Sequence, residues 1–565
     1  MIKERISKLR GKFNEFNIDG YVIPKNDEFF SEYTQKDRLK TISNFTGSAG
    51  YAIILKNKNY LFVDGRYSIQ AEKESAREFK IIKLNKIKNC KLFKNLVLGI
   101  DPNLFTLKEI NTFFKKYNKI KEIKTNLVDC IYNNYFYRSK PFFSLSKKIV
   151  GESYLIKIKK IASIIKKNKS NYLFVTAPEN VAWLLNIRGN DNPNSPIPNC
   201  RMIISSNKEI FLICEKIKAQ NLIKEKKIKK DNLILPKDFE SFIKRLKKNK
   251  IIIDETTCSL FYEKTLKRRF LISSKIDPIY LMKSIKNKIE IDNMINSHIF
   301  DGVALTKFLF WIKNKNKNEI NEYQAQLKLE NFRKKNKNYL YPSFNTIAGA
   351  GENGAIIHYK ADKIKSKKIR KNDIFLCDSG GQYRYGTTDV TRTICFSKPK
   401  KNIKEIFTKV LKGHIAVATA NLDKNFNGKL LDPLARKYLI KSGLDYEHGT
   451  GHGVGFFLNV HEGPQSISKY NNVKFQEGMI LSNEPGFYKK TKFGIRIENL
   501  VYVKKVDKKL SFKNLTLVPI EKELINFKKL EKKEKDYLFD YHLNVYSKLS
   551  PFLKNDEKKW LASFI

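Results

Sequence analysis

The sequence predicts a multidomain protein of mixed α/β and α+β class, with two related N-terminal α/β domains, a larger third domain and a helical C-terminal segment. Three observations support this prediction. The chain has 565 residues, which is more than one domain usually contains. Apolar strands alternate with helical segments up to residue 283, and a region rich in glycine and histidine follows. Beyond residue 506, Lys/Glu-rich helix alternates with scattered aromatic residues.

The first α/β domain is predicted at residues 1–145. A helix is expected from about Glu4 to Phe16, followed by the apolar strand DGYVIP. Two more strands, YAIILK and NYLFVD, are expected to pair through the Lys-Asn-Lys turn between them. The stretch from about Arg138 to Gly151 contains SKPFFS and is predicted to be a linker.

The second α/β domain is predicted at residues 146–283 and repeats the plan of the first. It begins with a helix and continues with apolar strands in NYLFVTAPENVAWLL, CRMIISS and EIFLIC. In both domains a strand ends near a proline and an asparagine, and a strand pair joined by a short polar turn follows. The repetition predicts a duplicated fold.

The third domain, residues 284–506, opens with the long amphipathic helix KNKIEIDNMINSHIFDGVALTKFLFWIKN. Its strands are short and its turns are rich in glycine. The tail, residues 507–565, ends in KKWLASFI. We expect a helical appendage that packs on the third domain or on a second subunit.

The chain is strongly basic, because its 110 Lys and Arg residues outnumber its 57 Asp and Glu residues and give it a net charge of +53. Such a charge is typical of proteins that bind nucleic acid. The basic runs nevertheless recur along the whole chain, at Lys224–Lys230, Lys244–Lys250 and Lys363–Lys371 among others. We therefore favour a compositional bias of the source proteome and do not expect nucleic acid to be a partner.

Hydropathy and cysteine usage indicate a cytoplasmic protein. No apolar run approaches the roughly 20 residues that cross a bilayer, and the charged N-terminal segment lacks the apolar stretch of a signal peptide. A membrane partner is therefore not expected. The odd number of cysteines and the absence of a CxxC pair predict buried, reduced thiols. The cysteines are at positions 90, 130, 200, 214, 258, 377 and 395.

Histidines are concentrated in the third domain, and three of them fall within EHGTGHGVGFFLNVHEGP. Three histidines beside several glycines are not a pattern of core packing, because glycine allows a backbone to approach a ligand or a metal ion closely. The segment therefore predicts a functional site. Five of the seven histidines lie between positions 358 and 461, namely His358, His414, His448, His452 and His461.

Four carboxylates near this segment have unusual positions. Asp378 ends the apolar strand NDIFLCDSG, and Asp389 lies at the start of TTDVTRTICF, with GGQYRYG as a short loop between them. We expect the two aspartates on neighbouring strands of a hairpin, with both carboxylates on one face. Glu484 ends the strand in GMILSNEPGF. Taken singly, each carboxylate is more often an exposed turn or strand residue.

The segment FGIRIENLVYV alternates strictly, which predicts a strand with Arg496 and Glu498 on one face. Carboxylates that converge inside a sheet repel one another and cost several kcal/mol each, on the order of a buried charge, unless cations neutralise them. Two divalent metal ions roughly 3.5 to 4 Å apart are the known solution. Four carboxylates and one histidine favour Mn²⁺, with Co²⁺ or Zn²⁺ as alternatives.

In order and spacing these residues resemble the metal ligands of the pita-bread metallopeptidases. The resemblance implies five ligands, which are Asp378, Asp389, His452, Glu484 and Glu498. The words GAIIHYKA, HGTGHGVGFFLNVHEGP and GIRIENLV are similar to the aminopeptidase P (Xaa-Pro aminopeptidase) branch of that family. Further words resemble its long, three-domain cytosolic form, so the resemblance covers nearly the whole chain. They include VDGRYSIQAEKE, ENVAWLLNIRGND, LTLVPIEKELI and DYHLNVYSKLSPFL.

This resemblance implies an architecture and an activity. The architecture is two creatinase-like α/β domains, 1–145 and 146–283, a pita-bread catalytic domain, 284–506, and a helical extension, 507–565, in a homodimer. The activity is hydrolysis of the first peptide bond of a peptide with proline in second position. Such peptides, with an N-terminal Xaa-Pro, would be the partners of the chain.

The resemblance also implies residue roles. Glu484 would be a metal ligand and would accept and pass on the proton of the attacking water. His358 and His461 would bind the scissile carbonyl and the oxyanion, whereas His448 and Arg496 would hold the substrate or the neighbouring carboxylates. His414 is expected to be structural, and His298 and His542 lie outside the predicted site.

Other interpretations of the sequence stay open. A prolidase shares all five ligands, although the N-terminal domains and the tail argue for the aminopeptidase. A catalytically silent pita-bread module could bind nucleic acid or chromatin, but such modules typically lose ligands. The sequence departs from the family pattern at Glu352 and Tyr385, neither of which is a predicted ligand or catalytic histidine.

Overall fold

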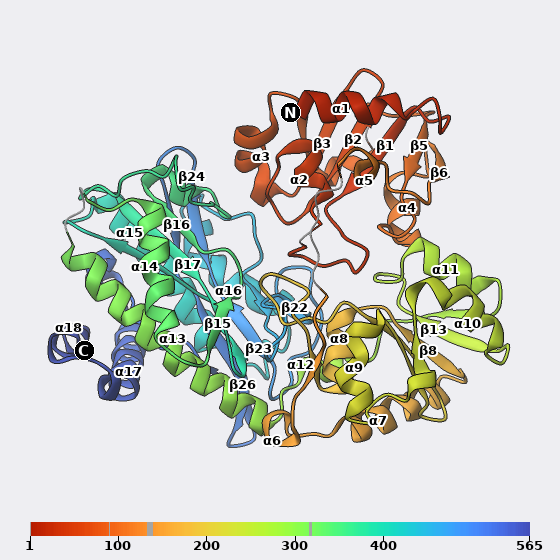
Figure 1. Cartoon of the computed structure of the whole chain (residues 1–565). Helices are drawn as coiled ribbons and strands as arrows, with labels where there is room; N and C mark the ends of the chain where they lie inside the picture. Colours follow the sequence, from red (N-terminus) through yellow and green to blue (C-terminus); the bar gives the residue numbers. More distant parts are fainter. Residues whose placement is uncertain (1, 35, 90, 133–138, 316–318) are drawn as a thin grey trace. The chain divides into compact units, whose positions relative to one another are not determined.

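The computed structural model describes the chain as two compact units, Met1–Tyr280 and Leu281–Ile565 (Figure 1). The residues it describes are 2–34, 36–89, 91–132, 139–315 and 319–565. Each unit has buried hydrophobic clusters of its own. The predicted division into four domains stays a prediction.

The first unit contains two six-stranded mixed sheets with the same topology. The first sheet has the order β4-β3-β2-β1-β5-β6, with two antiparallel pairs at its centre and parallel pairs outside them. The second sheet has the order β12-β11-β10-β8-β13-β14 and the same sequence of antiparallel and parallel pairs. This shared topology confirms the predicted pair of related α/β domains.

The strands of the two sheets follow the apolar segments of the sequence. Those of the first sheet are β1 (Gly20–Pro24), β2 (Gly50–Leu55), β3 (Asn59–Val63), β4 (Lys80–Lys83), β5 (Val97–Ile100) and β6 (Lys119–Glu122). Those of the second sheet are β8 (Tyr172–Val175), β10 (Arg201–Ser205), β11 (Ile210–Ile213), β12 (Leu233–Ile234), β13 (Lys250–Ile253) and β14 (Leu271–Ser274).

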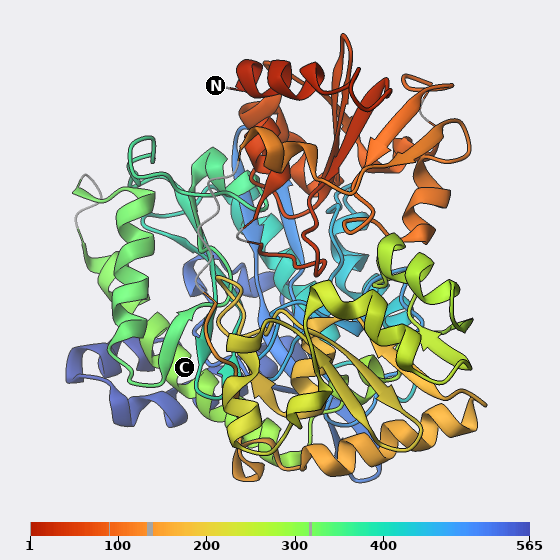
Figure 2. The ribbon, with the colours of Figure 1, turned by 45° about the vertical axis from the view of Figure 1, so that its right-hand side comes forward.

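Helices cover these sheets, and α1 packs against α2, α5 and β2, as the red helix of Figures 1 and 2 shows. The helices of the first domain are α1 (Ile2–Gly11), α2 (Arg38–Ser43), α3 (Ser68–Ser75), α4 (Leu107–Phe113) and α5 (Leu127–Ile131). Those that follow are α6 (Lys147–Val150), α7 (Tyr154–Lys167), α8 (Pro178–Leu185), α9 (Lys216–Lys224), α10 (Phe239–Arg245), α11 (Leu260–Lys267) and α12 (Ile279–Ser284).

Two local predictions for the first unit were wrong. The first helix ends at Gly11 instead of Phe16, because glycine is a poor helix former and the chain turns after it. The predicted linker contains the short strand β7 (Phe143–Ser144), which pairs with β9 (Ile187–Arg188). Arg138, where that linker was predicted to begin, lies outside the described residues.

The second unit opens with the predicted long helix, which is α13 (Lys288–Asn314). Asn287 caps its N-terminus, and Glu290 returns a bond to the Asn287 N–H to complete a capping box. The helices that follow are α14 (Glu322–Lys334), α15 (Lys401–Ala418), α16 (Gly428–Ile440), α17 (Lys532–Leu549) and α18 (Asn555–Ala562).

The strands of the second unit form small sheets. Two have three strands each, in the orders β15-β18-β19 and β16-β17-β20, and one has five, in the order β22-β21-β23-β26-β27, beside the hairpin β24-β25. The first strands are β15 (Tyr339–Pro342), β16 (Ile347–Ala350), β17 (Ile374–Ser379), β18 (Gly381–Tyr383), β19 (Gly386–Thr387) and β20 (Val390–Cys395). The others are β21 (Gly451–Gly453), β22 (Glu462–Ile467), β23 (Ile480–Asn483), β24 (Gly486–Lys489), β25 (Phe493–Arg496), β26 (Asn499–Val506) and β27 (Lys509–Asn514).

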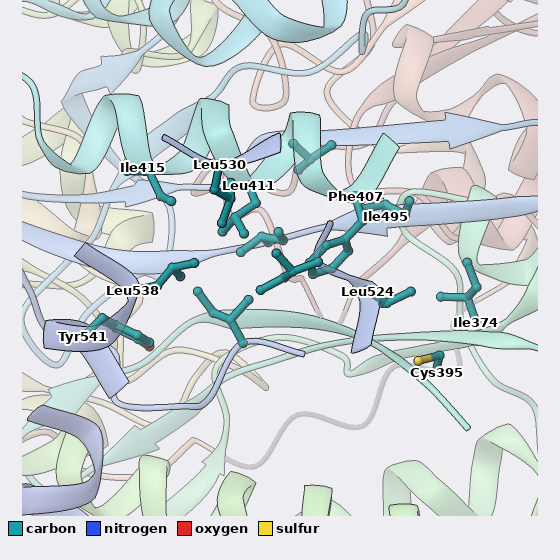
Figure 3. Packing of buried hydrophobic residues seen from close by; sticks show 14 of the residues in the cluster. Ile374, Cys395, Phe407, Leu411, Ile415, Ile495, Leu524, Leu530, Leu538 and Tyr541 are labelled. Atoms are coloured by element: carbon teal, nitrogen blue, oxygen red, sulfur yellow. The ribbon is translucent and has the colours of Figure 1, made fainter. Parts of the chain in front are cut away.

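A buried hydrophobic cluster joins the C-terminal extension to the strands of the second unit (Figure 3). Leu538 and Tyr541 on α17 belong to the same cluster as Ile495 on β25 and Leu411 on α15. Helix α17 also contacts α13, and the two lie side by side in Figures 1 and 2. The tail therefore packs on elements of the predicted third domain, which is one of its two expected positions.

Thiols and membrane spans can be assessed over the described residues. None of their helices is both long enough and apolar enough to cross a membrane. Six cysteines are free, and five of these are buried, as predicted. Cys130 is exposed, so the prediction of burial was wrong for it, and Cys90 lies outside the described residues.

Candidate metal centre

Two of the five predicted ligands lie within strands, and the other three lie directly before or after one. Asp378 is in β17, and Asp389 immediately precedes β20, the antiparallel partner of β17. His452 is in β21, Glu484 follows β23, and Glu498 precedes β26. Strands β21, β23 and β26 are consecutive in the five-stranded sheet.

These side chains form three overlapping groups of potential ligand atoms. The atoms within each group all lie within 4.8 Å of one another. The groups are Asp378 with Asp389 and Glu498, His452 with Glu484 and Glu498, and Asp389 with His452 and His461. The structure therefore brings all five predicted ligands together, and it adds His461 to them as a neighbour.

The loop predicted between Asp378 and Asp389 is a hairpin. Strands β18 and β19 pair with each other, and β18 also pairs with β15, which places this hairpin in a different sheet from β17 and β20. The Tyr383 hydroxyl donates to Asp301 Oδ1 on α13 at 2.8 Å, and the Tyr383 ring packs edge-on against Tyr339. These contacts with residues distant in the chain explain the difference from the prediction, since they draw the segment out of the sheet that contains β17 and β20.

The segment FGIRIENLVYV is also not one strand, because it contains β25 and β26, which belong to different sheets. The predicted faces are nevertheless confirmed. Thr391 Oγ1 donates to Glu498 Oε2 at 2.8 Å and accepts from Arg496 Nε at 3.0 Å. Ile495 and Ile497 instead belong to a buried hydrophobic cluster, in which Figure 3 labels Ile495.

Two glycines allow the close backbone approach on which the site depends. A Cβ atom on Gly451 would lie 1.9 Å from the carbonyl oxygen of Ser482, and one on Gly494 would lie 1.8 Å from that of Gly354. Neither distance is sterically possible, so these positions require glycine. Gly451 thereby lets β21, which carries His452, pack against β23, which leads to Glu484.

The electrostatics of the carboxylates favour bound cations. Burial raises the pKa of Asp378 to about 7 although Arg496 opposes it, and burial also raises the pKa values of Glu484 and Glu498. The Oδ1 atoms of Asp378 and Asp389 are buried and have no hydrogen-bond donor among the described residues. Divalent metal ions would satisfy these oxygens and stabilise the charged carboxylates, so the residues present fit a metal centre.

His452 is oriented as a metal ligand. Its Nδ1 lies 2.9 Å from the carbonyl oxygen of Gly453. A carbonyl oxygen only accepts, so Nδ1 carries the proton, and Nε2 is the nitrogen that would bind a metal ion. Nε2 lies 3.4 Å from Asp389 Oδ2 and 3.6 Å from Glu484 Oε1. Burial lowers the pKa of His452, but the two carboxylates outweigh burial and raise it to about 9. The imidazole therefore faces the same negative charge that would attract a metal ion.

The remaining predicted residues surround this group in different ways. The ring of His461 lies 4.3 Å from that of His452. His448 Nε2 lies 2.9 Å from the Tyr488 hydroxyl, which accepts from Arg496 Nη1 at 2.6 Å, and Arg496 Nη2 donates to Asp378 Oδ2 at 2.5 Å. A chain of hydrogen bonds thus links His448 to a predicted ligand.

His358 is placed less directly than the other predicted histidines. It is half-buried in the turn after η6 (Gly351–Ala355), and η6 packs against β17 and β25. None of the groups of potential ligand atoms found among the described residues includes His358.

Sequence reasoning missed several residues that hold the site. Thr391 and Tyr488 connect the predicted residues, and Ser482 Oγ accepts from the His452 N–H at 2.9 Å and donates to Glu484 Oε1 at 3.1 Å. Ser482 lies two residues before Glu484 and Tyr488 four residues after it, on the two strands that flank it. The alternation of those strands was the only available signal.

The other histidines and the two departures lie in structural settings. His414 is buried on α15 with Nδ1 3.1 Å from the carbonyl oxygen of Asn483. His298 Nδ1 contacts the Met294 carbonyl on α13, and His542 is on α17. Glu352 pairs with Lys367, and the Tyr385 ring packs edge-on against Phe457.

A fourth group of potential ligands, at Cys395, Glu521 and Glu523, already contains a cation. Lys313 Nζ lies 2.8 Å from Glu521 Oε2 and 3.3 Å from Glu523 Oε2, and it also donates to the Cys395 carbonyl. The lysine forms ion pairs with both glutamates, so this group is not a candidate metal site.

Comparison with known proteins defines the class of this fold and site. Residues 292–505 match the model of metallopeptidase family M24, and residues 5–130 and 136–290 each match a model of the creatinase/prolidase N-terminal domain. Residues 508–563 match the C-terminal region of the same peptidase family. The fold is therefore that of an M24 metallopeptidase with two creatinase-type domains before it, as the resemblance implied.

Individual proteins with similar sequences identify the branch of the M24 family to which the chain belongs. A probable Xaa-Pro aminopeptidase P of Laccaria bicolor is 38% identical over 600 residues, covering 99% of this chain and 92% of the relative. Xaa-Pro aminopeptidase 1 of Dictyostelium discoideum is 35% identical over 610 residues. That alignment covers 100% of this chain and 96% of the relative. The chain belongs to the Xaa-Pro aminopeptidase family of M24 metallopeptidases.

Solved structures agree with this assignment. The X-prolyl aminopeptidase of Caenorhabditis elegans, described as a cytosolic enzyme with a di-nuclear active site, superposes with a TM-score of 0.91 at 30% identity. The match covers 100% of this chain and 99% of that one. The prolidase of Pyrococcus horikoshii gives a TM-score of 0.52 at 26% identity and covers only 65% of this chain.

Proposed function

We propose that this protein is an Xaa-Pro aminopeptidase that hydrolyses the first peptide bond of peptides with proline in second position and releases the N-terminal residue. The observation that carries the proposal is the convergence of five potential ligands with His448, His461 and Arg496 at one site. The full-length similarity to Xaa-Pro aminopeptidases supports the same reaction.

The metal centre in this proposal takes two divalent ions. Asp378, Asp389, His452, Glu484 and Glu498 would hold them, and Mn²⁺ suits this oxygen-rich set better than Co²⁺ or Zn²⁺. When bound, such a pair of ions supplies a water nucleophile that ionises near neutral pH. The nematode enzyme, which is described as having a di-nuclear active site, supports the number two.

The side chains of the chain would then handle protons and charge. Glu484 would accept the proton of the attacking water and pass it to the leaving nitrogen, and its carboxylate is already held by Ser482 Oγ. His461, beside His452, and His358 would donate to the oxygen of the scissile carbonyl as negative charge develops there. Arg496 would orient Asp378 directly, and His448, which is linked to Arg496 through the Tyr488 hydroxyl, would help to hold the substrate.

The proline requirement follows from the amide itself. An Xaa-Pro amide has no N–H to donate, and the pyrrolidine ring fixes φ, so a site shaped for that ring excludes most ordinary peptides. The cationic amino terminus of the substrate would lie beside the carboxylates, most directly Asp378, whose Oδ1 has no donor among the described residues. That contact would limit cleavage to one residue from the end.

Location and assembly complete the proposal. We place the protein in the cytoplasm, because the nematode relative is described as cytosolic. The family resemblance supports a homodimer. The prolidase interpretation is less well supported, since the Pyrococcus horikoshii prolidase corresponds to only 65% of this chain.

The test is a comparison of substrates after metal loading. Purified protein with Mn²⁺ should release arginine from Arg-Pro-Pro and should act poorly on the dipeptide Gly-Pro, and EDTA should abolish both activities. Preferential hydrolysis of Gly-Pro would support the prolidase. Salt-dependent binding of DNA without any metal-dependent peptidase activity would instead support the silent binding module.

A further inference from the structure

We propose that Arg392 is a positioning residue through which the C-terminal extension holds the metal ligand Glu498 in place. Neither residue 392 nor the extension takes part in the chemistry described above. The proposal rests on the proposed metal centre, because it assigns to Arg392 and to Tyr541 of α17 a role in the affinity of that centre for metal ions.

Arg392 is 1% exposed, and all three nitrogens of its guanidinium group donate hydrogen bonds. On the side of the predicted metal centre, Nη1 donates to the carbonyl oxygen of the ligand Glu498 at 2.6 Å. It also donates to the carbonyl oxygen of Thr391, its neighbour in the chain, at 2.9 Å. Toward the extension, Nε donates to the Pro519 carbonyl at 3.0 Å. The remaining acceptors, all bonded to Nη2, are the Val518 carbonyl at 2.7 Å, Asn499 Oδ1 at 2.8 Å and the Tyr541 hydroxyl at 2.9 Å.

None of these six acceptors is a carboxylate, so the chain buries a cation whose hydrogen bonds all go to neutral groups. Burying a charge is costly unless many hydrogen bonds satisfy it. Arg392 meets this condition. Its positive charge also interacts with the carboxylate of Glu498, the residue whose carbonyl oxygen it binds. An arginine in this place therefore both fixes the backbone of a ligand and offsets part of the negative charge of the site.

Glu498 needs this support because it lies where the strand order breaks. Strand β25 ends at Arg496 and β26 begins at Asn499, so Glu498 belongs to neither ladder. Its N–H donates to the Thr391 carbonyl at 3.2 Å, and its own carbonyl accepts from Arg392. Its carboxylate accepts from Thr391 Oγ1. Residues 391 and 392 of β20 thus hold the side chain and the backbone of one ligand.

The extension completes this arrangement through one hydroxyl group. The Tyr541 hydroxyl accepts from Arg392 Nη2 and donates to the Val518 carbonyl at 2.7 Å. Tyr541 is fixed in turn by the hydrophobic cluster of Figure 3, which contains Leu538 from the same helix. Packing of α17 is therefore connected to the position of Glu498 by two consecutive hydrogen bonds.

The experiment measures Mn²⁺ affinity directly, by calorimetry and by competition with a chelator, together with thermal unfolding. The variants are Tyr541→Phe, which removes one hydroxyl group, and Arg392→Lys, which keeps the charge but loses most of the bonds. Tyr546→Phe is the matched control, because Tyr546 is half-buried on the same helix and is not among the acceptors of Arg392. We expect Tyr541→Phe and Arg392→Lys to weaken Mn²⁺ binding roughly 10-fold to 100-fold, as substitutions behind a metal ligand usually do. Tyr546→Phe should bind like the unsubstituted chain.

The outcomes separate this inference from the proposed function. If the unsubstituted chain binds two Mn²⁺ ions and folded Tyr541→Phe binds them equally well, the inference is overturned and the proposed function stands. A loss of thermal stability without a loss of Mn²⁺ affinity overturns it as well, since Arg392 would then be structural only. If the unsubstituted chain binds no metal, the proposed function fails and the inference falls with it.

Discussion

Glu484 illustrates how a single residue combines binding and proton transfer in the proposed mechanism. Its carboxylate faces His452 Nε2 at 3.6 Å and accepts from Ser482 Oγ, and burial raises its pKa. A raised pKa makes a carboxylate a better proton acceptor near neutral pH. Burial raises the pKa of Asp378 as well, to about 7, but Asp378 Oδ2 accepts from the Arg496 guanidinium, which suits a residue that only binds metal ions.

Replacing Glu484 by Gln should abolish hydrolysis while metal stays bound. The amide oxygen still ligates, but it cannot take up the proton, and general acid–base catalysis is worth roughly 10²-fold to 10⁴-fold. We expect kcat on Arg-Pro-Pro to fall by at least about 100-fold. Mn²⁺ content, measured by atomic absorption, should change little. Glu330→Gln on α14, whose carboxylate pairs with Lys334, is the control, and retained turnover in Glu484→Gln would remove that residue from proton transfer.

Helix α16 supports the loop that carries His448. Arg436 Nη2 donates to the His448 carbonyl at 2.7 Å and Nη1 to the Tyr446 carbonyl at 2.8 Å, while Nε donates to Asp432 Oδ2 at 2.8 Å. Asp432 Oδ1 also accepts from Thr450 Oγ1. A helix that contributes no predicted site residue therefore sets the position of one.

Replacing Arg436 by Met should lower catalysis more than metal binding. The methionine keeps apolar contact with Tyr446 but leaves the loop without its anchor, so His448 would shift while His452 stays in β21. A small misplacement of this kind lowers kcat on the order of tenfold or more. The measurement is kcat and KM on Arg-Pro-Pro beside Mn²⁺ content. Lys437→Met, one residue further along the same helix, is the control. An unchanged kcat in Arg436→Met would show that the anchor is dispensable.

Local patterns in the sequence predicted most of the elements, and the family resemblance singled out the five side chains that cluster in the structure. Alternation placed Arg496 and Glu498 on one face, and the structure has them on one face through Thr391. The strand break between these two residues was not predictable, since it depends on which sheet each half joins. The hairpin at 381–387 was missed for the same reason. Its position depends on Asp301, which is 82 residues away from Tyr383 in the chain.

The second unit is held together by buried contacts between segments that are far apart in the chain. The cluster of Figure 3 extends from Ile374 to Leu561 and includes strands, helices and the C-terminal extension. His542, next to Tyr541, accepts from the Ile520 N–H at 3.1 Å. Burial, aided by the charge of Arg392, lowers the pKa of His542 from 6.5 to about 4. The folded state therefore requires this histidine to be neutral.

The stability that His542 contributes to the folded state should therefore fall as the pH decreases through the range between 6.5 and 4. The unfolded chain takes up a proton on His542 below about pH 6.5, whereas the folded chain does so only near pH 4. The contribution of His542 is fully present above pH 6.5, and about 2 kcal/mol of it is lost between pH 7 and pH 5.

His542→Gln keeps an acceptor for Ile520 without a titrating group. Its free energy of unfolding in urea should accordingly decrease less between pH 7 and pH 5, by about 2 kcal/mol, than that of the unsubstituted chain. Equal decreases in the two proteins would contradict the assignment to His542.

The bond between Arg392 and Tyr541 also has a consequence for the order of events during synthesis. The two residues are 149 positions apart, and Tyr541 leaves the ribosome after every predicted metal ligand has done so. Domains fold as units once their sequence is available, and here the unit includes α17. A nascent chain that has just exposed Glu498 still lacks the helix that fixes it. If Arg392 positions Glu498 as proposed, metal ions would be bound tightly only after α17 has been synthesised, and an incomplete chain would stay inactive.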